Sequence, residues 1–242
     1  MSATTVAVKL LAGLIFGYLT ISVCESFFHR TIQHAGVSVR LWYAKAGALG
    51  RALLNAWYAH HVVHHFLTCR RNHVTQFSCD EERAKLDQHL SDRGLADIIA
   101  CRYGVALGKE FKSYAQYMAP TMPIFVVLCY FGGGWFTVGA CIPLCIWPML
   151  AQCIHPYLHM RYARVLHHGP RPISWLARTR YFRYLARYHW LHHRYTNCNY
   201  NLLVGGDRLL CVHRAASEED LEEMRSIGLA VPQECVREAK AG

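Results

Sequence analysis

The feature that most constrains this chain is a set of four histidine clusters, each lying just beyond an apolar run. A neutral imidazole is a nitrogen ligand suited to iron, zinc, copper and nickel. Ten imidazoles are too many for one metal ion and about right for two. The fold therefore has to bring these clusters together. The ten residues are His29 and His34; His61, His64 and His65; His155 and His159; and His189, His192 and His193.

Spacing within the clusters favours helices. Residues at i, i+3 and i+4 share one helix face, so each histidine triplet can present three nitrogens together. His155 and His159 are likewise one turn apart. His29 and His34 are five apart, about 140° around an ideal helix. We therefore expect that helix to end or unwind between them.

Composition favours a membrane protein with a basic face. The 242 residues are 53% hydrophobic yet carry a net charge of +10, a length typical of one large domain. The anionic cytoplasmic leaflet is the expected counter-surface for the basic residues. No nucleic-acid partner is expected, because no recognition motif of the usual kinds is present. Eleven cysteines without a C-x-x-C pair favour a reducing, cytoplasm-facing environment.

Apolar runs predict an all-α integral membrane protein with three or four transmembrane helices and a cytosolic, histidine-rich helical cap. The run Val6–Val23 has the length of one bilayer crossing and is predicted to be a retained helix. The uncharged run from residue 120 to 153 contains three consecutive glycines, a turn signal. It predicts a helical hairpin, Thr121–Phe131 and Trp135–Cys153. Residues 41–67 follow the pattern of one amphipathic helix.

The distribution of positive charge predicts the orientation. Lysine and arginine crowd residues 30–118 and 161–194, whereas the amino-terminal tail has only Lys9. By the positive-inside rule, both basic regions are cytoplasmic. With a hairpin, all four histidine clusters then face the cytoplasm. The alternative, a single long tilted helix, would place His29 and His155 on opposite sides.

The remaining segments are predicted to be parts of one membrane domain over residues 1–242. Residues 70–118 are polar and charged and are expected to form a cytosolic insertion with a helix around Leu95–Tyr103. The charged tail, 214–242, contains a capping-box pattern that predicts a helix over Leu221–Ile227. No function is predicted for the tail.

The order H-x4-H, H-x2-H-H, H-x3-H, H-x2-H-H resembles the fatty acid hydroxylase and sterol desaturase superfamily of membrane di-iron oxygenases. The stretch from Arg194 to Leu209 also resembles the closing segment of that family. The similarity spans about residues 24–212, most of the chain. Any one cluster would be weak evidence, whereas four in order are strong.

The resemblance implies two iron ions held by the ten histidines. It further implies hydroxylation of a C–H bond of a lipid-like substrate, which enters from the membrane, by O2. Electrons would come from a separate reductase with a cytochrome b5-like or ferredoxin-like carrier. A desaturase of the same superfamily is one alternative. A membrane metal-binding or metal-transport protein without redox catalysis is another.

Some residues stay open at this point. The first ligand of the second cluster is either His60 or His61, which are adjacent. His61 is preferred, because it repeats the H-x2-H-H spacing of the last cluster. His167 and His168 form an additional pair whose role in metal or substrate binding is undecided. Ligating histidines are usually oriented through their other ring nitrogen. Candidates for such orienting groups are Glu25, Asn199 and Asp207.

Overall fold

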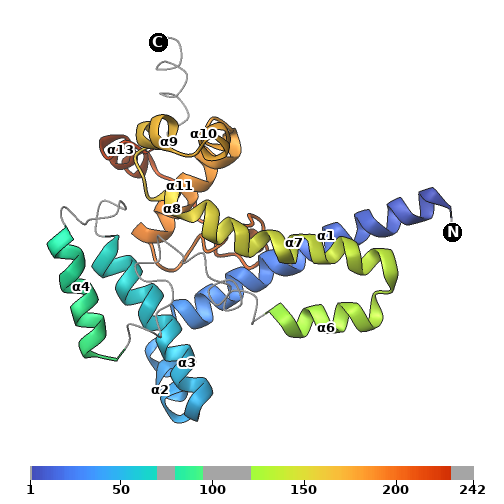
Figure 1. The fold of residues 1–242 in the computed structure, drawn as a ribbon, viewed down its shortest axis with the longest axis horizontal. Helices are drawn as coiled ribbons and strands as arrows, with labels where there is room; N and C mark the ends of the chain where they lie inside the picture. The colour runs from blue at the N-terminus through green and yellow to red at the C-terminus, as the bar shows by residue number, and fades with distance from the viewer. Residues whose placement is uncertain (1, 70–79, 95–120, 230–242) are drawn as a thin grey trace, which may run out of the picture.

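The computed structural model describes residues 2–69, 80–94 and 121–229 (Figure 1). This part of the chain contains helices and loops and no strand, which confirms the all-α prediction. The predicted helix around Leu95–Tyr103 lies outside the described residues.

The longest helix carries the first histidine cluster. Helix α1 (Ala3–Phe28) continues without a break into the π-helix η1 (His29–Gln33). The predicted hairpin is present as α6 (Met122–Phe131) and α7 (Gly134–Cys153), and Gly133 forms the turn with a positive φ of 61°. Helices α1 and α7 lie side by side and run in the same direction, so both end beside the histidines (Figure 1).

Small residues allow α1 and α7 to pack with their backbones close together. A Cβ added to Gly13 would lie 2.0 Å from the Phe136 carbonyl oxygen, and one added to Gly17 would lie 2.4 Å from that of Ala140. Small residues spaced four apart are typical of closely packed membrane helices. This packing fixes the end of α1 relative to the end of α7.

The prediction of one continuous amphipathic helix over residues 41–67 is wrong, because the chain turns back at residues 46–47. Helix α2 (Val37–Lys45) ends there, and α3 (Gly47–Trp57) follows and leads into a second π-helix, η2 (Tyr58–Thr68). Gly47 has a φ of 61°, which ordinary residues rarely adopt. A Cβ at Gly50 would meet the Tyr43 carbonyl oxygen at 1.8 Å, so this hairpin also depends on glycine.

The remaining helices pack against different parts of the chain. Helix α11 (Arg180–Arg194) buries Phe182 and Leu185 against Leu158 and Val165. The predicted tail helix is confirmed as α13, which begins three residues earlier than expected behind a Ser217–Asp220 capping box. The other helices are α4 (Asp80–Asp92), α8 (His155–Leu158), α9 (Tyr162–His168), α10 (Arg171–Ala177), α12 (Gly206–Leu209) and α13 (Glu218–Ser226). Helix α8 follows α7, α12 packs against α1, α13 against α11, and α4 against η2.

Large apolar side chains face outward along the hairpin and its neighbour. Ile15 of α1, Phe131 of α6 and Ile142 of α7 are exposed, together with others on the same helices. Within the described chain, one helical stretch, Ala3–Gln33, is long and apolar enough to cross a bilayer. The predicted three or four spans therefore stay a prediction.

Candidate metal centre

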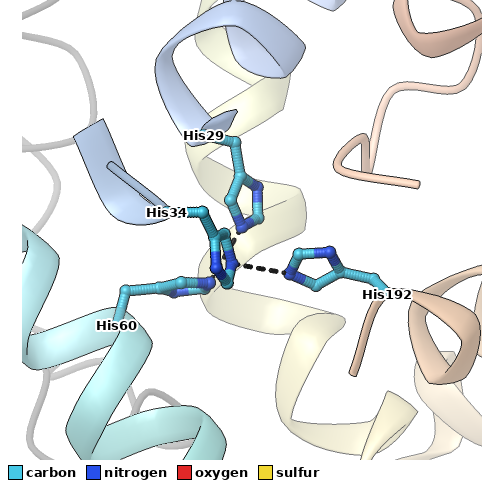
Figure 2. Close-up of side chains that lie close together, drawn as sticks. All are labelled: His29, His34, His60 and His192. Carbon is cyan, nitrogen blue, oxygen red and sulfur yellow. Dashed lines mark hydrogen bonds between the residues drawn. The ribbon is translucent and has the colours of Figure 1, made fainter. Parts of the chain in front are cut away.

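Five histidines from three parts of the chain form the first histidine group: His29, His34, His60, His65 and His192. Nε2 of His60 lies 2.8 Å from Nε2 of His29 and 3.2 Å from Nε2 of His65. Nε2 of His192 lies 3.1 Å from Nε2 of His34. Figure 2 shows four of these rings, carried by η1, η2 and α11, pointing toward one another.

The other five histidines form the second histidine group: His64, His155, His159, His189 and His193. Nε2 of His189 lies 2.9 Å from Nε2 of both His155 and His159, and these two are 3.2 Å apart. The His64 ring lies 4.9 Å from the His159 ring, and the His193 ring lies 4.7 Å from it, centre to centre. Four of the five side chains are fully or almost fully buried.

The two groups are adjacent, and each histidine triplet contributes to both. Nε2 of His65 lies 3.2 Å from Nε2 of His60 in the first group, but ligand atoms of His65 also lie within 4.8 Å of those of His64 and His193. His192 belongs to the first group. The rings of His65 and His193 stack at 3.9 Å, which links the groups. The last triplet lies together on α11, with its three rings 4.7 to 5.8 Å apart, but its members contact both groups. Sequence spacing indicated which residues converge but not how they divide.

Two π-helical segments explain the positions of His34 and His60. The amide of His34 donates to the carbonyl of His29, five residues back, at 2.9 Å, and the two rings stack. The expected end of the helix between them is confirmed, because the turn widens into a π-helix that ends at Gln33 and His34 is its C-cap. In η2 the same i to i+5 spacing places His60 beside His65. Such segments occur frequently at functional sites.

Backbone carbonyls hold two ligand rings of the first group. Nδ1 of His29 lies 2.9 Å from the Tyr200 carbonyl oxygen, and Nδ1 of His192 lies 2.9 Å from that of Cys198. A carbonyl accepts only, so Nδ1 carries the proton and donates, and the Nε2 lone pair points into the group. Sequence reasoning missed these two carbonyls, because backbone groups leave no signal in residue type.

Glu25, Asn199 and Asp207 act on the loop that supplies those carbonyls. The Glu25 carboxylate accepts from the amides of Leu202 and Leu203, at 2.9 and 3.0 Å. Asp207 accepts from the Tyr188 hydroxyl at 2.6 Å and from the Asn201 amide at 2.9 Å.

Asn199 has a φ of 55° and pairs with the backbone of Arg214 through its side-chain amide. Among the described residues, the hydrogen bonds of Glu25, Asn199 and Asp207 run to the loop and its supports and not to a histidine ring. These three residues therefore affect the histidines only indirectly, by fixing the position of the loop.

Burial keeps the imidazoles neutral. Desolvation, followed by the neighbouring histidines, holds the pKa of His34, His60 and His65 well below the ordinary 6.5. Desolvation lowers the pKa of His192 to about 3, against the opposing effect of its bond to the Cys198 carbonyl. A neutral imidazole has a free lone pair, which is the form that binds a metal ion.

The nitrogen spacing in the second group is compatible with metal binding. Two ligands at right angles around a metal, each about 2.1 Å away, lie about 3.0 Å apart, whereas tetrahedral ligands lie about 3.4 Å apart. The three Nε2 atoms of His155, His159 and His189 are separated by 2.9, 2.9 and 3.2 Å. One metal ion could contact all three of these nitrogens.

The other candidate histidines lie elsewhere. His61 is half-buried and meets the first group through Nδ1, which lies 2.9 Å from Nδ1 of His34. His167 and His168 are exposed at the end of α9 and belong to neither group.

An open surface pocket of about 460 Å³ lies beside the carboxyl-terminal end of α3. Leu54, Trp57 and Tyr58 form an apolar wall, and Asn55 and Arg93 supply polar groups. The Trp57 ring stacks on His61 at 5.6 Å, so one wall of the pocket is close to the histidines. The volume is within the range of small-molecule sites.

Comparison of the chain with protein-family models, curated proteins and solved structures finds no match.

Proposed function

We propose that this chain is a membrane di-iron oxygenase that hydroxylates a C–H bond of a lipid-like substrate. The observation that carries the proposal is the convergence of ten imidazoles into two adjacent groups at the ends of apolar helices. Nine of these ten histidines are ligands that the sequence predicted. The tenth is His60, which takes the place of the predicted His61. Imidazole suits iron as well as zinc, and the proposed oxidation requires a redox-active metal, which zinc is not.

Bound iron would supply the activation of O2, as the resemblance to the fatty acid hydroxylase superfamily implies. The chain's own residues hold and orient the ligands. The Tyr200 and Cys198 carbonyls fix which nitrogen of His29 and His192 faces inward. Burial of His64, His159 and His192 excludes water from the interior of both groups. A dry site limits loss of a reactive oxidant to solvent.

A lipid-like substrate fits the surroundings of the site. Exposed apolar side chains lie along α1, α6 and α7, as expected of a surface that faces lipid. An acyl or isoprenoid chain in the bilayer would reach the site from that surface. The pocket beside Trp57 offers an apolar wall of suitable size.

The reaction requires an external reductant. Hydroxylation inserts one oxygen atom of O2 into the C–H bond, and the second atom leaves as water with two electrons and two protons. We expect a separate reductase, with a cytochrome b5-like or ferredoxin-like carrier, to deliver those electrons. A desaturase would consume the same O2 and electrons but would remove two hydrogens from the substrate and release both oxygen atoms as water.

Lipid mass spectrometry under 18O2 tests the proposal. Cells that express the chain should accumulate a lipid with one added 18O atom, and cells with His64→Ala or His192→Ala should not. His167→Ala is the matched control, because that histidine is exposed and outside both groups. An unlabelled product with two fewer hydrogens would favour the desaturase. Full activity in either of the first two variants, or metal uptake into cells without a changed lipid, would overturn the proposal.

A further inference from the structure

Two neighbouring histidines, His60 and His61, contact the first histidine group in different ways. His60 directs Nε2 inward, between Nε2 of His29 at 2.8 Å and Nε2 of His65 at 3.2 Å. His61 instead lies behind His34, with their Nδ1 atoms 2.9 Å apart. One residue is inside the cluster of Nε2 atoms and the other is outside it.

We propose that His60 is a metal ligand of the first group and that His61 is a positioning residue that holds the His34 ring. This inference rests on the proposed metal centre. It reverses the assignment that the H-x2-H-H spacing favours, in which His61 is the ligand.

The π-helical turn of η2 is the physical reason for the reversal. In an α-helix, residues four apart share a face, so His61 would accompany His65. In η2 the amide of Cys69 donates to the carbonyl of His64, five residues back, at 2.8 Å. Residues five apart then share a face, which pairs His60 with His65. The rings of His60 and His65 are 4.9 Å apart, whereas those of His61 and His65 are 6.3 Å apart.

The hydrogen bond from His34 to His61 gives the latter its role. His34 points Nε2 toward Nε2 of His192, so a metal-binding His34 carries its proton on Nδ1. That proton is donated to Nδ1 of His61, which must accept and therefore carries its own proton on Nε2. The Nδ1 protons of His29 and His192 are accepted by backbone carbonyls, which a substitution cannot remove. The Nδ1 proton of His34 is accepted by a side chain, so a substitution of His61 removes that acceptor.

The surroundings of His61 hold it in place. Its ring stacks on Trp57 at 5.6 Å and meets the edge of Phe66 at 5.2 Å. Arg40 lies 4.1 Å above the Trp57 ring on a cation–π contact. His61 is thus fixed between two aromatic rings, as an orienting group has to be.

Matched substitutions of the two neighbours test the assignment. The full-length protein, purified in detergent, is loaded anaerobically with Fe(II), and bound iron is counted and titrated. At saturating iron, His60→Phe should lose one ion per chain relative to wild type, and His61→Phe should lose none. His61→Phe should weaken iron binding about 10- to 100-fold, as loss of an orienting group does. His61→Gln, whose side-chain oxygen accepts a hydrogen bond, should restore most of the affinity.

His167→Phe is the control, and circular dichroism verifies that each variant is folded. Should His60→Phe fail to fold, His60→Gln replaces it with the same expected loss. Loss of an ion in the His61 variants but not in the His60 variants overturns the assignment, as does equal loss in both. A His61→Gln that binds iron no better than His61→Phe removes the positioning role. Wild-type protein that binds no iron overturns the metal centre itself, and this inference with it.

Discussion

At the scale of single residues, the candidate centre depends on imidazoles that are buried without charge. Desolvation lowers the pKa of His34, His60, His65 and His192, and each additional neighbouring histidine lowers it further. Protonating one ring would put a charge into a site where, among the described residues, its closest neighbours are other imidazoles. The same neutrality that prepares the site for a cation makes the metal-free protein sensitive to acid.

Metal-free protein should lose stability as the pH falls below about 6.5. His192 has a pKa of about 3 when folded and an ordinary value of 6.5 when unfolded. Between these values the unfolded chain binds more protons, so the free energy of unfolding decreases as the pH drops through that window. Thermal melts at pH 7.5, 6 and 5 measure this. A melting temperature that is constant or rises toward pH 5 contradicts the neutral, buried histidines.

At the scale of elements, helix geometry decides how much of the site the sequence could predict. The α-helical spacing of His189, His192 and His193 was correctly recognised, because α11 is an ordinary helix. His155 and His159 are one turn apart as expected, although α8 is a single turn and His159 is its C-cap. The place of His60 was not favoured, because propensity and periodicity do not distinguish a π-helical turn from an α-helical one. The turn between α2 and α3 at Gly47 was also missed, because the apolar periodicity continues through it. The turn depends on tertiary packing, in which Gly50 lies against the Tyr43 carbonyl oxygen.

The packing of α1 against α7 should determine how His29 lies relative to His155, and hence how well the site binds iron. Gly17→Ala places a Cβ 2.4 Å from the Ala140 carbonyl oxygen, so the helices must separate. We expect a loss of about 1–3 kcal/mol of stability, typical of overpacking, and weaker iron binding because His29 moves relative to His155. Gly36→Ala is the control, since nothing lies within 4 Å of its Cβ. Equal melting temperatures and iron affinities in the two variants would show that this packing does not position the site.

At the scale of the whole molecule, the hairpin brings the histidine clusters to one end. Helices α1 and α7 run in the same direction (Figure 1). His29 follows directly after α1, and His155 lies two residues beyond the end of α7. The three-glycine turn signal and the absence of charge over residues 120–153 predicted the hairpin, and the distribution of positive charge was needed to favour it over a single long helix. How the two groups divide the ten histidines depends on side-chain packing among η1, η2 and α11, which pattern and charge do not encode.

Protease accessibility tests the predicted orientation. Positive charge on the histidine side predicts that this side faces the cytoplasm and that the amino terminus lies across the membrane. In inverted membrane vesicles, protease should therefore remove a tag placed after residue 242 and leave a tag before residue 1 intact. Carbonate washing should leave the protein in the membrane. Release by carbonate, or the opposite digestion pattern, contradicts the proposed topology.

The number of iron ions bound per chain tests the central claim most directly. Elemental analysis of purified, Fe(II)-loaded wild-type protein should give two ions per chain, one for each histidine group. Combined replacement of His155 and His159 by alanine should leave one, because those residues belong to the second group alone. Wild-type protein that binds no iron, or a single ion lost completely on that replacement, would contradict two adjacent metal centres.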